Sequence, residues 1–197
     1  MKLENDDNFL NALNQKIPQR IMIMGRPGSG KSTFSIKLQS MLNIPLYHLD
    51  KHFFEANWVQ RNYQDFLNQQ QYFVSQSSWI IDGNSSKSLE LRYIRADICL
   101  YFNFPRYLCY YRTIKRLFHK HPAIDDRAPG CKETVRWSLL EYMWGYEKRM
   151  RPILSQLKTN YPNVKLIELR SDQDVILFTE NLLQMINQPL FDFKTPD

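Results

Sequence analysis

The sequence predicts an α/β fold in which a five-stranded parallel sheet carries helices on both faces. Five short apolar runs alternate along the chain with segments of helical periodicity, and a glycine-rich segment directly follows the first run. Alternating strands and helices favour a parallel sheet with right-handed crossovers that is covered on both sides. At 197 residues the chain can bury one sizeable core, so a single domain is expected.

The elements are expected in a regular order. The strands are apolar runs bounded by Pro, Gly, Asn or Asp, whereas the helices repeat their apolar residues every three or four positions. Pro105 suits the first turn of a helix, and Pro152 is expected to kink or interrupt a long one. The strands are expected at residues 20–24, 45–49, 79–81, 97–102 and 164–169, and the helices at 31–42, within 51–77, and at 89–94, 105–119, 133–158 and 174–186.

Residues 25–32 read Gly-Arg-Pro-Gly-Ser-Gly-Lys-Ser and fit the pattern G-x-x-x-x-G-K-[ST] at every fixed position. Glycines let the backbone curl, so that successive N–H groups surround an anion at the N-terminus of the next helix. Lys31 would add a charge for the β- and γ-phosphates of ATP, and the Ser32 hydroxyl could ligate Mg²⁺. The alternative is a glycine-rich turn that contains a lysine by chance, but the strand before it and the helix after it favour nucleotide binding. The predicted nucleotide-binding residues are Gly25, Arg26, Pro27, Gly28, Ser29, Gly30, Lys31, Ser32 and Thr33.

Two aspartates follow predicted strands. Ligands of open parallel sheets bind beyond the carboxyl ends of the strands, so these positions are candidates for the site. Asp82 could hold Mg²⁺ together with Ser32, or it could cap the turn before the next helix. Asp50 could accept a proton from an acceptor hydroxyl, bind the acceptor or help to hold Mg²⁺, or it could be a helix N-cap.

Several arginines are candidates for binding phosphate. Arg112 and Arg116 lie one helical turn apart, just before a polar loop at 119–132. Planar cations suit the charge that spreads over a transferring phosphoryl group. Arg127 lies in the loop and could swing in when the loop closes as a lid, and Arg92 could contact an anionic acceptor. A solvated surface charge is the competing interpretation for these arginines. The predicted catalytic residues are Lys31, Asp50, Arg112 and Arg116.

Composition narrows the class of protein. Lysine and arginine outnumber the acidic residues by 26 to 20, giving a net charge of +6, which suits an enzyme for anionic phosphates. The dispersed charge and the lack of a helix-turn-helix pattern argue against direct DNA binding. The three cysteines lack metal-ligand spacing and indicate reduced thiols. Residues 1–19 lack the features of a signal peptide, and no segment has the roughly 20 apolar residues of a membrane span, so a cytoplasmic protein is expected.

Further segments follow the glycine-rich loop GRPGSGKST in a fixed order: YHLD (47–50), WIIDGN (79–84), PRYLCYYR (105–112), RAPGCKE (127–133) and WGY (144–146). With them the chain, from about residue 20 to 170, resembles the bacterial DNA topology modulation proteins, which are P-loop proteins related to adenylate and shikimate kinases. The resemblance implies a P-loop NTPase fold of the nucleoside-kinase type, with an acceptor insert at about 51–77 and a lid at about 119–132. It matches Asp82 to the aspartate of the kinases' Asp-Gly segment, and Arg112 and Arg116 to their paired lid arginines.

One departure bears on the acceptor. Adenylate kinases follow Asp-Gly with Phe-Pro-Arg, which helps to hold AMP, whereas Asn84-Ser85-Ser86 stands here. This difference argues against AMP as the acceptor.

Two functions therefore fit the sequence. The first is an ATP-dependent kinase that uses Mg²⁺ and transfers the γ-phosphate to an unidentified polar or anionic acceptor. The second is a nucleotide-binding regulator that affects DNA topology without turning over a small molecule. The expected organisation is an extension at 1–19, one kinase-like domain at 20–188 and a tail at 189–197, and the sequence does not indicate the oligomeric state.

Overall fold

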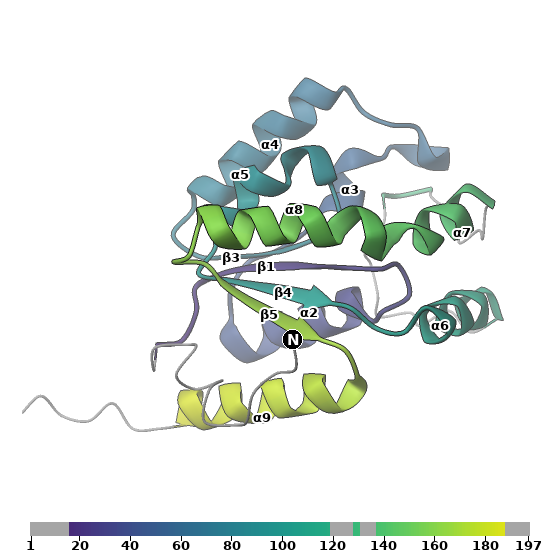
Figure 1. The fold of residues 1–197 in the computed structure, drawn as a ribbon. Helices are drawn as coiled ribbons and strands as arrows, with labels where there is room; N and C mark the ends of the chain where they lie inside the picture. The colour runs from purple at the N-terminus through teal and green to yellow at the C-terminus, as the bar shows by residue number, and fades with distance from the viewer. Residues whose placement is uncertain (1–15, 119–127, 131–136, 188–197) are drawn as a thin grey trace, which may run out of the picture.

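A five-stranded parallel sheet forms the centre of the computed structural model, which describes residues 16–118, 128–130 and 137–187 (Figure 1). The strand order is β2-β3-β1-β4-β5, and each neighbouring pair is parallel. The strands are β1 (Arg20–Gly25), β2 (Leu46–His48), β3 (Trp79–Asp82), β4 (Ile98–Phe102) and β5 (Lys165–Leu169). The predicted five-stranded parallel sheet is confirmed, and the ends of its strands differ from the prediction by no more than one residue.

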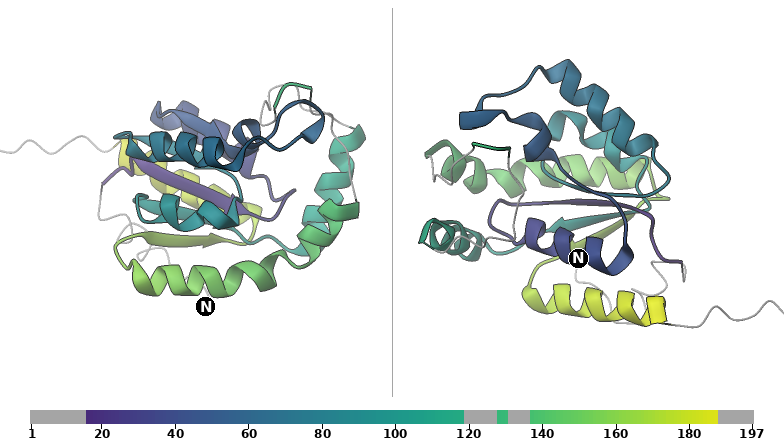
Figure 2. Two further views of the ribbon diagram at one scale, coloured as in Figure 1. Left: turned by 90° about the horizontal axis from the view of Figure 1, so that it is seen from above. Right: turned by 180° about the vertical axis from the view of Figure 1, so that it is seen from behind.

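Helices cover both faces of the sheet (Figures 1 and 2). One face is covered by α2 (Lys31–Leu42) and α9 (Asp172–Asn187). The other is covered by α3 (Leu49–Phe53), α4 (Tyr63–Ser75), α5 (Leu89–Tyr93) and α8 (Tyr146–Asn160). Beyond the carboxyl ends of the strands stand α6 (Arg106–Phe118) and α7 (Trp137–Trp144), and η1 (Ala56–Trp58) and η2 (Ser86–Ser88) are short 3₁₀ turns.

Each face of the sheet has its own hydrophobic core, because successive strand residues point to opposite sides. In β1, Ile21 and Ile23 face α2 and α9, whereas Met22 and Met24 face α4, α5 and α8. All four side chains are fully buried. A strand buried on both faces must be apolar throughout, which explains the unbroken apolar runs of the sequence.

The prediction of one long helix at 133–158 is wrong in one respect. Gly145 divides it into α7 and α8, and α8 continues through Pro152 as one helix. The physical reason is that the fully buried side chains on either side of Gly145 belong to different cores: Met143 packs in the core beneath α2 and α9, whereas Tyr146 packs in the other. A glycine is the least costly residue at which to change the helix direction.

The segment predicted as an acceptor insert projects above the sheet and consists of α3, η1 and α4 (Figure 1). Leu49, expected to end a strand, instead begins α3. At the tip, Asn57 and Trp58 both have positive φ, and the Asn57 N–H lies 3.5 Å from the carbonyl oxygen of Gly130. Of the predicted lid, the structure describes only 128–130; the other lid residues, residues 1–15 of the extension and the tail lie outside the described residues. None of the helices in the described part of the chain is long and apolar enough to cross a membrane.

Candidate functional site

The glycine-rich loop joins β1 to α2 and has the backbone conformation of an anion-binding nest. Gly28 and Gly30 have φ values of 77° and 94°, in the left-handed region that glycine favours. Gly30 is the N-cap of α2 and its carbonyl accepts the first helical hydrogen bond from the Phe34 N–H at 3.0 Å. The N–H groups of the first helical turn have no partner within the helix, so they are free to bind an anion.

Neighbouring backbone explains why glycine is needed at two positions of the loop. A Cβ on Gly25 would lie 2.5 Å from the Phe102 carbonyl oxygen of β4, and a Cβ on Gly28 would collide with the Cys109 carbonyl oxygen of α6. Backbone atoms cannot move aside as the end of a side chain can. The loop is therefore held closely against β4 and α6.

Lys31 and the serines of the loop lie around the nest. The Lys31 side chain is only 9% exposed, and its Nζ lies 3.4 Å from the Arg26 carbonyl oxygen, so the ammonium group reaches back over the loop. The buried Ser29 hydroxyl has no hydrogen-bond partner among the residues that the structure describes. Ser32 is half-buried, and Thr33 is exposed on the first turn of α2.

Asp82 ends β3 beside the loop and pairs with His48, the last residue of β2. The Nδ1 atom of His48 lies 3.0 Å from Oδ2 of Asp82, and both residues are buried. Burial by itself would raise the pKa of the Asp82 carboxyl, but the hydrogen bond to His48 and the charge of Lys31 outweigh it. The pKa therefore lies below its ordinary value, and the carboxylate is ionised at neutral pH.

The second oxygen of Asp82 fits a metal-bound role. Oδ1 is buried without a hydrogen-bond partner among the described residues, although the Ser32 hydroxyl is close enough to lower the carboxyl pKa further. A buried, unpartnered carboxylate oxygen is costly in a fold unless a cation or water meets it. Mg²⁺ takes one or two protein oxygens and completes its shell with phosphates and water, so Asp82 and Ser32 fit it. Within the described ranges no three His, Cys, Asp or Glu residues cluster as a metal site of their own.

Of the α6 arginines, Arg112 lies beside the loop. Nη1 of Arg112 is 3.5 Å from the Ser29 carbonyl oxygen, and its guanidinium group lies 5.2 Å from the centre of the Phe104 ring. Nη2 forms an ion pair of 2.5 Å with Asp172 at the start of α9. Arg116 follows one turn later and is half-buried. The structure thus brings Arg112 to the nest, while Arg127 lies outside the described residues.

Two arginines differ from the sequence-based expectation. Arg26 is 1% exposed, and its guanidinium group donates to the carbonyl oxygens of Met143 and Phe104 at 3.1 and 2.7 Å. Its side chain therefore packs behind the loop and is turned away from the predicted nucleotide site. Arg92 is 0% exposed and donates to backbone carbonyl oxygens of the loop after β3. The expected contact of Arg92 with an acceptor is wrong, because burial and three hydrogen bonds keep its guanidinium group inside the protein.

Asp50 lies in the first turn of α3 and is exposed. Its negative charge acts on Tyr142 of α7: burial mainly, and the charge of Asp50 in addition, raise the pKa of this tyrosine to about 12. Arg149 donates to the Tyr142 carbonyl oxygen at 2.5 Å and covers its ring at 4.8 Å. A carboxylate, a phenol and a guanidinium group therefore lie together between α3 and the α7–α8 junction.

Sequence reasoning missed three residues of this region. His48, Asn84 and Tyr146 stand in the segments YHLD, WIIDGN and WGY, but none of the three is among the predicted site residues. In the structure Asn84 exchanges two hydrogen bonds with the backbone of Gly25, and Tyr146 donates to the same amide. No local pattern marks these residues, but His48 ends β2 and Asn84 lies two residues after β3, and the rule for parallel sheets could have used these positions as a signal.

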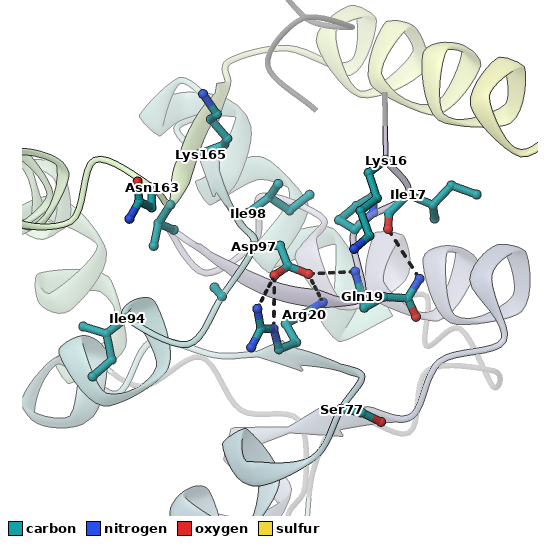
Figure 3. A pocket seen from close by; sticks show the side chains of 13 residues that line it. Lys16, Ile17, Gln19, Arg20, Ser77, Ile94, Asp97, Ile98, Asn163 and Lys165 are labelled. Atoms are coloured by element: carbon teal, nitrogen blue, oxygen red, sulfur yellow. Dashed lines mark hydrogen bonds and ion pairs between the residues drawn. The ribbon is translucent and has the colours of Figure 1, made fainter. Parts of the chain in front are cut away.

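A cavity of about 470 Å³ lies at the opposite edge of the sheet, where the strands begin (Figure 3). In its centre Asp97 accepts hydrogen bonds from the backbone N–H groups of Gln19 and Arg20, both at 2.9 Å, and pairs with the Arg20 guanidinium group at 2.6 Å. Both carboxylate oxygens of Asp97 are thus satisfied within the protein. The cavity is separate from the glycine-rich loop, which lies at the carboxyl edge.

Comparison with known proteins identifies the fold. No family model and no curated protein matches the chain, so the narrower resemblance to DNA topology modulation proteins stays a prediction. A solved shikimate kinase from Acinetobacter baumannii in complex with shikimate matches with a TM-score of 0.56 at 13% identity, over 91% of this chain and 99% of that one. A shikimate kinase from Bacteroides thetaiotaomicron matches with a TM-score of 0.52 at 14% identity, over 85% of this chain and 96% of that one. The chain therefore has the α/β fold of the P-loop, nucleoside-kinase-like proteins that its sequence predicts.

Proposed function

We propose that this protein is a small ATP-dependent kinase that transfers the γ-phosphate of ATP to a polar or anionic acceptor. The observation that supports it most is the buried Asp82 carboxylate. One of its oxygens is hydrogen-bonded to His48, and the other has no partner among the described residues, with Ser32 and Lys31 nearby. An anion-binding nest alone suits any phosphate. A nest with an oriented, ionised carboxylate next to it suits a triphosphate with its metal ion.

Each residue has a role in this proposal. The loop from Gly25 to Thr33 surrounds the phosphates, and the Lys31 ammonium group neutralises the β- and γ-phosphates. Ser32 and Asp82 would hold Mg²⁺, which would neutralise charge between the β- and γ-phosphates when bound. Arg112 and Arg116 stabilise the negative charge that develops on the transferring group, and Arg127 completes the site from the lid.

The acceptor side of the proposal uses the exposed group of charges around Tyr142. Asp50 orients the acceptor hydroxyl and takes its proton. Arg149, rather than the buried Arg92, supplies the cation for an anionic acceptor, because it is exposed and lies over the Tyr142 ring. A hydroxylated carboxylate, such as the shikimate in the complex of the similar kinase, belongs among the compounds to test.

The proposed organisation keeps residues 20–188 as one kinase-like domain, with the insert at about 51–77, the lid at about 119–132, an extension at 1–19 and a tail at 189–197. The acceptor binds between the insert and the α7–α8 junction, beside Asp50, Tyr142 and Arg149. A cytosolic location, where ATP and reduced thiols are present, completes the proposal.

Release of ADP in the presence of ATP and Mg²⁺ tests the proposal, measured against a panel of hydroxylated carboxylates, sugars, nucleosides and nucleotides. We expect one class of acceptor to raise the rate well above the ATP-only background. The Lys31→Ala variant should lose at least about a hundredfold of this rate. Lys37→Ala is the matched control, since Lys37 is an exposed lysine farther along α2.

The same experiment also tests the alternative function, a nucleotide-binding regulator that affects DNA topology. It predicts tight ATP binding, no acceptor-dependent ADP release, and a DNA interaction that weakens with salt. Acceptor-dependent turnover that equals wild type in Lys31→Ala would contradict the role of this loop and of Lys31 in phosphate transfer.

A further inference from the structure

The side-chain amide of Asn84 occupies the place of a backbone peptide group between β1 and the loop after β3. Its Oδ1 accepts the Gly25 N–H at 3.0 Å, and its Nδ2 donates to the Gly25 carbonyl oxygen at 2.7 Å. Gly25 is the last residue of β1 and the first of the glycine-rich loop. Both polar backbone groups at the entrance to the loop are therefore bonded to one side chain.

The register of the sheet shows what this amide replaces. β1 and β3 pair up to Ile23 and Asp82, and the Gly83 N–H donates to the Ile23 carbonyl oxygen at 3.1 Å. In a regular parallel ladder, the Gly25 N–H would next donate to the carbonyl oxygen of Gly83. The side chain of Asn84 supplies that acceptor instead, so it extends the hydrogen bonding between β1 and β3 by one further bond.

The backbone oxygen that would complete the regular ladder is held elsewhere. Arg92 donates to the carbonyl oxygens of Gly83 and Ser85 at 3.0 and 2.7 Å, on either side of Asn84. Burial lowers the pKa of Arg92 to about 10, which still leaves its guanidinium group charged at neutral pH. The buried arginine thus turns the chain away from β1 and presents the Asn84 side chain in its place.

The orientation of the Asn84 amide is fixed by a third group. The Tyr146 hydroxyl, at the start of α8, donates to Oδ1 of Asn84 at 2.9 Å. Burial raises the pKa of Tyr146 well above its ordinary value, so the hydroxyl keeps its proton and remains a donor. An amide turned by 180° would place its NH₂ group against two donors, which is unfavourable.

The same loop is also bonded to the insert. The Ser88 hydroxyl lies 2.8 Å from Oε1 of Gln70, which is fully buried in α4, and 2.7 Å from the Ser85 hydroxyl. Residues 83–88 therefore contact the insert on one side and the glycine-rich loop on the other. Asn84 is the side chain that makes the contact with the glycine-rich loop.

We propose that Asn84 is a positioning residue: its amide holds Gly25 in the conformation from which the loop can surround the phosphates of ATP. The proposal rests on the proposed function for the identity of the ligand. Gly25 has a φ of 152°, a backbone angle that few residues in folded proteins adopt. Without its two hydrogen bonds, the loop would also populate other backbone conformations. A site that is correctly formed only part of the time binds its ligand in proportion to that fraction.

The test compares Asn84→Ala with Asn103→Ala. Asn103 is a matched control because it directly follows the neighbouring strand β4, is also half-buried, and bonds side chains away from the loop: Glu168 at 2.7 Å and Tyr101 at 3.4 Å. For each variant, calorimetry with ATP and Mg²⁺ gives the Kd, and thermal unfolding gives the Tm. We expect Asn84→Ala to weaken ATP binding by about tenfold, the effect of one or two lost hydrogen bonds, and Asn103→Ala to retain wild-type affinity.

Tyr146→Phe provides a graded variant. It removes only the hydroxyl that orients the amide, so its ATP affinity should fall between those of wild type and Asn84→Ala. Amide hydrogen exchange at Gly25, Arg26 and residues 28–32, measured without nucleotide, should be faster in Asn84→Ala and unchanged in Asn103→Ala.

The exchange measurement separates the two proposals. If wild type does not bind ATP but amide hydrogen exchange in the loop is faster in Asn84→Ala, the proposed function is contradicted, whereas the positioning role of Asn84 at the loop is supported. Equal ATP affinity and equal loop exchange in Asn84→Ala and wild type would overturn the positioning role. So would an equal loss of affinity in Asn103→Ala, because the effect would then be general destabilisation.

Discussion

Nδ1 of His48 lies 3.0 Å from Oδ2 of Asp82, and this hydrogen bond joins the ends of β2 and β3 beside the glycine-rich loop. A carboxylate can only accept, so Nδ1 carries the proton. The bond orients the carboxylate, whose other oxygen has no partner among the residues described. The charge state and the direction of Asp82 are thus set before any ligand binds.

Asp82→Asn should remove the Mg²⁺-dependent part of ATP affinity. A neutral amide is a weak ligand for Mg²⁺ compared with a carboxylate. ATP titrations with and without MgCl₂ measure this part, and Asp65→Asn, at an exposed position in α4, is the control. An equal response of wild type and Asp82→Asn to Mg²⁺ would argue against Asp82 as a ligand.

His48→Ala should destabilise the protein. It leaves a second buried oxygen of Asp82 unpaired, which costs about 1–3 kcal/mol in the free energy of unfolding. Urea unfolding at neutral pH measures it, and His48→Asn, which can still donate a hydrogen bond, should be less affected. If His48→Ala is as stable as wild type, the pair does not contribute to stability.

His52 should make the stability depend on pH. Burial is the main cause that lowers its pKa from 6.5, and its ring contacts Phe73 edge-to-face at 4.8 Å. The unfolded chain therefore binds a proton at His52 more readily than the folded protein does. The contribution of His52 to the free energy of unfolding is fully present above its pKa in the unfolded chain, near 6.5, and is lost as the pH falls towards its lower pKa in the folded protein. Unfolding at pH 7.5 and 5.5 should show a smaller loss in His52→Phe than in wild type, and equal losses would contradict this origin.

Asp97→Ala should affect stability alone. Asp97 binds Arg20 and two backbone N–H groups at the amino edge of the sheet, and these bonds hold its pKa below the ordinary value although burial would raise it. The pair is partly exposed, so the loss is expected to be about 1–2 kcal/mol. ATP affinity should stay unchanged, because the site lies at the opposite edge; a large fall in affinity would indicate coupling between the edges.

The fold could be predicted because its signals are local. Each strand is an apolar run with turn residues at its ends, and the loop at 25–32 carries its own pattern, so neither depended on distant contacts. The contact between His48 and Asp82 could not be predicted in the same way. It depends on β2 lying next to β3, which is a matter of strand order rather than of local sequence.

The direction of a side chain was equally hard to predict. Arg26 lies in the glycine-rich loop and Arg92 is a candidate for binding the acceptor, yet both guanidinium groups turn inwards and bond to backbone carbonyl oxygens. An arginine side chain can bind a ligand, or it can stabilise a turn of the chain by donating to backbone carbonyl oxygens. The sequence alone does not distinguish these two roles. Gly145 gave a similar difficulty, since only the two separate cores show why the helix must end there.

Titration of wild-type protein with ATP and Mg²⁺ in a calorimeter, beside Lys31→Ala and Lys37→Ala, tests the central claim most directly. We predict saturable binding at one site per chain for wild type and Lys37→Ala, and a loss of at least about a hundredfold in affinity for Lys31→Ala. No heat of binding for wild type with ATP or GTP, or equal affinity in all three proteins, would contradict the claim that this loop binds a nucleoside triphosphate.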